Sequence, residues 1–220
     1  MQKFETTAPI TAVLDVPAGR IQFIAADRTD ATVEVRPANP SKGRDVKTAE
    51  QTTATFTDGV LHITAATPGS QLLGPGSLEV TVQLPAGSHV QAKTASTELR
   101  VVGRLGQVSY EGAYRNIKID EAAQLNLTAV DGTVEVGRLT GPAQITTARG
   151  DITIDEAEHG TVDLRTHQGN ITVNTAPHAS AALNASTPHG RVDNALKNNG
   201  TTTLHIHATT SNGNITAHTL

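Results

Sequence analysis

One short pattern, repeated along the second half of the chain, decides the fold. Residues 147–154 read Thr-Ala-Arg-Gly-Asp-Ile-Thr-Ile, and residues 166–173 read Thr-His-Gln-Gly-Asn-Ile-Thr-Val. Apolar residues two and four positions after the glycine alternate with polar ones, as in a strand with one buried face. The same alternation precedes the glycine, which supplies the backbone freedom of a tight turn. Each copy therefore predicts a strand, a turn and a second strand.

The pattern recurs along residues 89–220, with successive turn positions 17 to 23 residues apart. Five copies have glycine at the turn, and two earlier copies have Thr97 and Arg115 there: the glycines are Gly132, Gly150, Gly169, Gly190 and Gly213. The residue two positions after each turn is predicted to lie in the core: Leu99, Ile117, Val134, Ile152, Ile171, Val192 and Ile215. A shift by one residue would turn this apolar set outward, so the register is well determined.

No single copy can bury its own apolar face, so the copies must stack. A period of ~19 residues is too short for a propeller blade or a helical repeat, and it fits one coil of a β-solenoid. The sequence therefore predicts an all-β, single-stranded β-helix, or β-solenoid, with seven coils over residues 89–220. Threonines three positions before the glycines are expected to form a hydroxyl ladder between coils: Thr147, Thr166, Thr187 and Thr210.

Residues 1–88 are less regular. Parts of the template fit residues 12–23 and 54–63, while polar stretches at 37–50 and 68–77 are predicted to be surface loops. We expect this part to be an irregular or β-sandwich-like cap, because an open first coil would leave an unpaired strand edge. Residues 1–220 are then a single domain, with the cap at 1–88 and the solenoid at 89–220.

The repeats at 147–154 and 166–173 resemble those of the bacterial "putative adhesin" family of uncharacterised domains. The opening, Met1–Arg20, is similar to that of actinobacterial members, as are residues 103–106 and 194–198. The resemblance covers essentially the whole chain. It implies a right-handed β-helix and an adhesin-like role, and it carries over no catalytic residue. Handedness follows from this resemblance alone, because left-handed coils can have the same period.

Composition excludes several classes of protein. The net charge of −4 gives no field for nucleic acid, and the absence of cysteine excludes disulfides and thiolate chemistry. Aromatic residues are 2% of the chain, too few for stacking platforms for bases or sugars. No apolar run is long enough to insert in a membrane, and no signal peptide is visible. We therefore expect a cytoplasmic protein, with the cell surface, reached by an unrecognised route, as the alternative.

Histidines are the best candidates for a site, because seven of the nine follow residue 158 and neutral imidazole binds Zn, Cu or Ni. His205 and His207 flank the apolar Ile206, so both are expected to point outward on one strand. His167 and His189 precede their turn glycines in coils that the repeat predicts to be adjacent. No acidic residue recurs beside them at ligand spacing. We therefore predict exposed polar side chains, with no metal site and no cofactor.

No nucleotide-binding loop, nucleophile elbow or zinc-protease motif is present. This absence favours a non-enzymatic binding or scaffold module, whose partner is an unknown protein or a cell-envelope glycan. Two alternatives stay open. One is a glycan-active enzyme, whose acid groups would come from loops such as residues 120–121 and 155–158. The other is an oligomeric structural protein, a homo-oligomer formed through exposed coil ends.

Overall fold

The computed structural model describes residues 1–65, 76–114 and 116–220, which fall into two compact units, Met1–Arg115 and Asn116–Leu220. In these residues the chain is all-β and solenoid-like with one helix, which confirms the coarse part of the predicted fold class. The handedness and the ~19-residue coil stay predictions. The single domain and its division at residue 88 stay predictions too. No helix in the described part is both long and apolar enough to cross a membrane.

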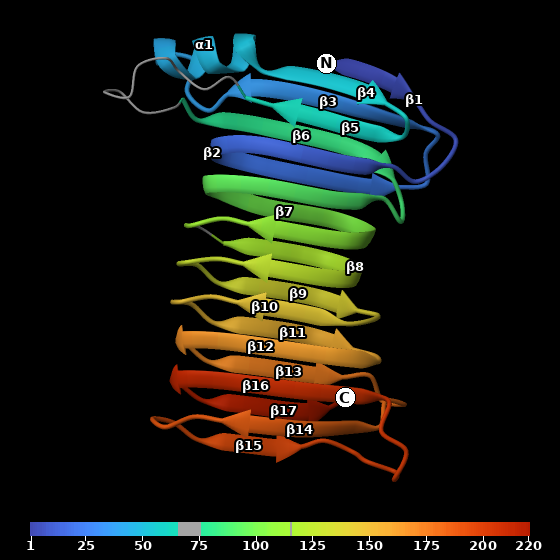
Figure 1. Ribbon diagram of the computed structural model, residues 1–220, viewed down its shortest axis with the longest axis vertical. Helices are drawn as coiled ribbons and strands as arrows, with labels where there is room; N and C mark the ends of the chain where they lie inside the picture. Colours follow the sequence, from blue (N-terminus) through green and yellow to red (C-terminus); the bar gives the residue numbers. More distant parts are fainter. Residues whose placement is uncertain (66–75, 115) are drawn as a thin grey trace. The chain divides into compact units, whose positions relative to one another are not determined.

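The elements of each unit follow in chain order (Figure 1). The first unit contains β1 (Gln2–Glu5), β2 (Thr11–Ala26), β3 (Asp30–Pro37), α1 (Gly43–Gln51), β4 (Thr53–Thr57), β5 (Val60–Thr64), β6 (Leu78–Pro85) and β7 (His89–Glu111). The second unit contains β8 (Ile117–Thr128), β9 (Val134–Leu139), β10 (Ala143–Thr146), β11 (Ile152–Ala157), β12 (Gly160–Gln168), β13 (Ile171–Thr175), β14 (Ala181–Ser186), β15 (Val192–Ala195), β16 (Leu204–Asn212) and β17 (Ile215–Thr219).

The strands of the second unit pair in parallel in two columns, and each coil gives one strand to each. The first column runs from the end of β8 through β10, β12 and β16 to β14. The second column runs from the start of β8 through β9, β11, β13 and β17 to β15. Residues at equal repeat positions lie side by side on paired strands, for example Ile152 and Ile171. The core therefore lies between the columns, as the alternation predicts.

The order of the coils in space differs from their order in the chain. The last coil, β16–β17, lies between the β12–β13 coil and the β14–β15 coil, as Figure 1 shows. The prediction that neighbouring repeats stack in sequence is therefore wrong at this end. The β14–β15 coil becomes the end of the stack instead.

The turn glycines stand directly above one another in this same order. A Cβ atom on Gly150 or Gly169 would lie 2.1 Å from the carbonyl oxygen of the glycine in the preceding coil, so no larger residue fits. Positive φ angles occur at Gly132, Gly150, Gly169 and Gly213 but not at Gly190. Gly190 is needed for the close approach instead, because its Cβ would lie 1.9 Å from the oxygen of Gly213.

Hydroxyl groups and amide side chains join the coils at the turns. The Oγ1 atoms of Thr166, Thr210 and Thr187 donate to the carbonyl oxygens of Gly150, Gly169 and Gly213 at 3.2, 2.9 and 2.9 Å. Three of the four threonines of the predicted ladder therefore bind glycine carbonyls across coils, and not other hydroxyls. The fourth, Thr147, donates to the carbonyl oxygen of Arg149 in its own turn at 3.1 Å. Beside the ladder, the side-chain oxygens of Asp151, Asn170 and Asn214 each accept the next coil's backbone N–H: those of Asn170, Asn214 and Arg191.

Six of the seven residues predicted to be core are buried: Leu99, Ile117, Val134, Ile152, Ile171 and Ile215. The seventh, Val192, is 47% exposed and corrects the prediction. It lies on β15 at the end of the stack, where no further coil covers it.

In the first unit, too, the order of the strands in space differs from their order in the chain. β2, the first long strand, pairs in parallel with β5 and β6 on one side and with β7 on the other. Beyond β5 and β6, antiparallel β4, β3 and β1 cover the edge.

The predicted loop at 37–50 is wrong, because α1 occupies Gly43–Gln51. The helix has two apolar residues, Val46 and Ala49, which are too few for a sequence pattern to reveal it. Its buried residues are Asp45 and Thr48, and the Asp45 carboxylate accepts the N–H of Ser77 at 3.1 Å. Most of the loop predicted at 68–77 lies outside the described residues, since these exclude 66–75.

Candidate functional site

Among the polar side chains that point outward from the first column of the second unit, ten form two rows across all five strands, and we call these ten the polar face. One row across the five strands consists of Asn126, Gln144, Asp163, His207 and Asn184. A second row, two residues further along each strand, consists of Thr128, Thr146, Arg165, Thr209 and Ser186. The face holds one acidic and one permanently basic side chain. It is therefore dominated by neutral hydrogen-bonding groups.

The polar face stands on a rigid base. Between its two rows lie Ile145, Leu164 and Ala208, which point inward and are at most 1% exposed. Parallel pairing on both sides fixes the backbone of β10, β12 and β16. The side chains are therefore held about 4.8 Å apart across strands and about 6.6 Å apart along them. Such a surface loses little backbone entropy when a ligand binds.

None of the ten side chains makes a hydrogen bond or an ion pair with another group among the described residues. The second column differs, because several of its outward charges pair with each other. Lys118 Nζ lies 2.7 Å from a Glu135 oxygen, His218 lies 3.7 Å from Asp193, and Arg138 pairs with Glu158. The polar face thus has its donors and acceptors available to a ligand.

Two of the four candidate histidines lie on the first column. His205 and His207 are exposed on either side of the buried Ile206, as the alternation predicts. His207 stands opposite Asp163 on β12 and Asn184 on β14, while His205 stands opposite Thr161 and Ala182. The structure therefore places His207 in a row of polar groups.

His167 and His189 do not lie in adjacent coils, because the β16–β17 coil separates them. His167 Nδ1 lies 3.5 Å from the hydroxyl of Ser211. The backbone of His189 forms an isolated parallel β-bridge with Asn212. Within the part of the chain that the structure describes, no group of three metal-ligating side chains is placed to hold an ion.

The carboxylates of the enzyme alternative are spread over neighbouring coils of the second column. A hollow of about 240 Å³ is lined by Asp120, Glu135 and Asp155, with Gly137 between the two aspartates. Glu135 pairs with Lys118, and Arg138 lies 3.9 Å from Glu156 and also pairs with Glu158. The guanidinium accordingly has a raised pKa, chiefly because it donates a hydrogen bond to Glu158. Three of the glutamates are therefore engaged in ion pairs.

The hollows of the first unit are bounded by groups with structural partners. One of about 280 Å³ is lined by Arg20, Lys42, Asp45 and Glu98, among others. Arg20 pairs with Glu98 at 3.3 Å, and Asp45 binds the backbone of Ser77. Another, of about 410 Å³, lies beside Glu5 and Phe56, where the Phe56 ring packs on Phe4 at 5.8 Å.

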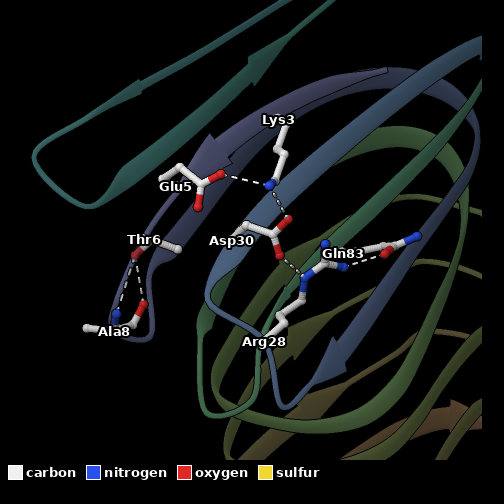
Figure 2. A network of polar contacts seen from close by, with 7 residues as sticks. All are labelled: Lys3, Glu5, Thr6, Ala8, Arg28, Asp30 and Gln83. Atoms are coloured by element: carbon white, nitrogen blue, oxygen red, sulfur yellow. Dashed lines mark hydrogen bonds and ion pairs between the residues drawn. The ribbon is translucent and has the colours of Figure 1, made fainter.

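A charged network ties the edge strand β1 to its neighbours (Figure 2). Lys3 Nζ lies 2.7 Å from Glu5 and 3.5 Å from Asp30, and Arg28 donates to Asp30 at 2.7 Å and also to Gln83. The hydrogen bond from Arg28 lowers the pKa of Asp30, and the hydrogen bond to Glu5 raises the pKa of Lys3. Because each charge has a partner, the network acts as a clasp.

Sequence reasoning missed most of the polar face. Asn126, Gln144, Thr146 and Thr209 occupy outward positions of the repeat, and the register places them outward. The signal was therefore available: outward side chains in the first strand of each coil are almost all neutral. What the repeat could not give is that β14 lies beyond β16.

The chain belongs to the Toastrack DUF4097 family, whose sequence model matches residues 11–219. This confirms the family resemblance drawn from the repeats. No curated protein matches the chain.

Solved structures of bacterial proteins align with nearly the whole chain. A "putative cell adhesion protein" from Clostridium sporogenes is 9% identical, with a TM-score of 0.41, over 100% of this chain and 98% of that one. A "putative adhesin" from Bacteroides fragilis is 15% identical, with a TM-score of 0.47, over 98% and 95%. Another from Parabacteroides distasonis is 14% identical, with a TM-score of 0.46, over 98% and 95%.

Proposed function

We propose that the protein is a non-enzymatic, adhesin-like binding module and that the polar face is its binding surface. The observation that carries the proposal is the set of ten outward polar side chains on five paired strands, none of them bonded within the described residues. Polar groups in fixed rows suit a partner that offers hydrogen-bonding groups in an extended, regular array.

An extended, neutral glycan of the cell envelope fits this chemistry better than a protein. Protein interfaces concentrate their binding energy in buried aromatic and arginine side chains, and the polar face has no aromatic residue and one arginine. A polymer of hydroxyl groups can instead bond to amide, hydroxyl and imidazole groups along several strands. Without aromatic stacking each contact is weak, so useful binding requires many contacts or many copies.

The test is a co-sedimentation assay with insoluble cell-wall glycan from the native host. The face variant combines Gln144→Ala, Thr146→Ala, His207→Ala and Thr209→Ala. The matched control combines Thr153→Ala, Thr172→Ala and Thr216→Ala, a row of outward threonines on the second column. We expect the face variant to lose at least tenfold in bound fraction at equal protein concentration, and the control to bind as the wild type does.

Equal binding by the face variant and the wild type would refute the polar face as the binding surface. Release of soluble sugar by the wild type would refute the non-enzymatic function and support the glycan-active alternative. Both variants change only outward side chains, and circular dichroism checks that they fold.

A further inference from the structure

The β14–β15 coil ends the stack of the second unit, and β15 is the open edge. In the described residues, β15 pairs with β17 on one side and with no strand on the other. All four of its residues are exposed, and Val192, at an inward position of the repeat, is 47% exposed. An unpaired edge with an uncovered apolar residue is a template for another strand.

The loop that follows β15 covers part of this end but leaves β15 open. The N–H of Ala181 on β14 donates to the carbonyl of Lys197 at 3.0 Å, and the Asn198 amide donates to the Ala181 carbonyl at 3.1 Å. On β15, the Arg191 carbonyl accepts the N–H of Ile215, so it points toward β17. By the alternation of a parallel strand, the backbone groups of Val192 and Asn194 point away from the stack.

We propose that β15 pairs antiparallel with β15 of a second copy across a two-fold axis, with Val192 facing Val192. In an antiparallel pair, the side chains of two directly opposed residues point to the same face of the sheet. The two-fold axis must therefore set one residue opposite its own copy, and it cannot lie between two residue positions. Centred on Val192, this pairing sets Arg191 opposite Asp193 of the second copy, twice. It also buries the two valines against each other.

The charges select this register over its neighbours. An axis through Arg191 or through Asp193 would set two like charges directly opposite each other. An axis through Asn194 would set Arg191 opposite Lys197. An axis through Ala195 would set Asp193 opposite Lys197, but the backbone N–H and carbonyl of Lys197 are already bonded to Thr219 and Ala181. Of the axes through Arg191, Val192, Asp193 and Asn194, only the one through Val192 pairs opposite charges. Cross-strand pairs of opposite charge stabilise a sheet, whereas like pairs destabilise it. The edge is therefore complementary to itself, as a two-fold interface requires.

Analytical ultracentrifugation over a concentration series tests the proposal on the full chain. We expect a monomer–dimer equilibrium for the wild type. Arg191→Asp and Asp193→Arg should each be monomeric, because each sets like charges opposite one another. An equimolar mixture of the two should form a heterodimer, and the double variant R191D/D193R should dimerise by itself. Arg104→Asp, an exposed change in the first unit, is the control and should dimerise as the wild type does.

A wild type that stays monomeric up to high micromolar concentration would overturn the proposal. So would a dimer that survives Arg191→Asp, since the contact would then lie elsewhere. Folded single variants that fail to dimerise when mixed would also overturn it. Thermal melting confirms that each variant is folded, which is expected because both side chains are exposed. None of these outcomes depends on the polar face or on any glycan.

Discussion

The hydroxyl of Thr210 donates a hydrogen bond to the carbonyl oxygen of Gly169 at 2.9 Å, although the two residues are 41 positions apart in the chain. In a stack that followed the sequence, Thr187 would make this contact. Thr187 instead bonds the carbonyl of Gly213 at 2.9 Å. These two bonds join the inserted last coil to the coils on either side of it. Substitution of either threonine therefore measures how much one such bond contributes to the free energy of unfolding.

Thr210→Val should lower the free energy of unfolding by about 1 to 2 kcal/mol, because the hydroxyl is lost in a buried position and a carbonyl loses a partner. Thr210→Ser keeps the donor and should recover part of the loss. Urea unfolding measures both. Thr201→Val, on an exposed loop, is the control and should change stability by less than about 0.5 kcal/mol. Equal stability of Thr210→Val and wild type would contradict the bond's role.

Gly169→Ala should destabilise the second unit by more than about 3 kcal/mol or prevent its folding. A Cβ there would lie 2.1 Å from a backbone oxygen, at a φ of +152°. Gly200→Ala is the matched control, because Gly200 also has a positive φ but no atom within 4 Å of an added Cβ. It should cost only the backbone strain, about 1 kcal/mol. Chemical denaturation compares them, and similar losses for both would show that close approach is not the constraint.

The register of the coils could be predicted from the sequence for a physical reason. A strand alternates its faces, so each glycine with apolar residues at fixed offsets identifies which side chains point inward. Ile152 and Ile171 are both fully buried and paired with each other, as that rule requires.

Ile152→Asp and Ile171→Asp should each cost more than about 4 kcal/mol, because each buries a charge with no partner between the columns. In the monomer, at protein concentrations too low for the proposed dimer, Val192→Asp should cost less than about 1 kcal/mol, because Val192 has the same repeat position but is 47% exposed. Thermal melting of the three proteins makes the comparison. A loss at Val192 as large as at Ile152 would show that the end of the stack is covered even in the monomer.

The order of the coils could not be predicted from periodicity, because every coil satisfies the same template. Asp151, Asn170 and Asn214 each accept a backbone N–H from the next coil, and the equivalent residue of the β14–β15 coil is Arg191. Arginine has no acceptor atom, so its coil fits at the end of the ladder. The arginine at this position agrees with the place of the β14–β15 coil at the end of the stack.

Thr97→Val should raise the free energy of unfolding by about 1 kcal/mol, in contrast to the usual effect of a core substitution. Thr97 is fully buried, and its hydroxyl has no hydrogen-bond partner among the described residues. Valine keeps the shape and removes the unsatisfied group. The control is Thr94→Val, which should be destabilising because the Thr94 hydroxyl donates to Tyr110 at 3.0 Å. Urea unfolding decides, and a loss at Thr97 would show that its hydroxyl has a partner in solution.

The clasp on β1 should make part of the protein's stability sensitive to acid. The hydrogen bond from Arg28 lowers the pKa of Asp30 in the folded state. Its stabilisation is therefore present above the ordinary aspartate pKa and is lost as the pH falls through the lower folded value. Between about pH 4 and about pH 2, Asp30→Asn should flatten the fall in melting temperature. Arg28→Met should do the same, and the double variant should add nothing. Unchanged acid sensitivity in Asp30→Asn would contradict this.

The candidate site was only partly accessible to sequence reasoning. His205 and His207 could be placed outward because they flank an apolar residue on one strand, which requires only local alternation. Their neighbours Asp163 and Asn184 come from strands that precede β16 by different distances in the chain. The position of Asn184 beyond β16 depends on the coil order, and the same error led to the pairing of His167 with His189.

The inserted coil also governs how the second unit can be made. As the chain leaves the ribosome, β12–β13 and β14–β15 emerge before β16–β17, and each then has an edge that only the final coil can fill. Until Thr219 has been synthesised, those two edges can pair with each other in a register that the finished protein does not have. Coil-by-coil folding during translation therefore cannot reach the native order. The last step is the entry of two strands into a gap whose sides already exist.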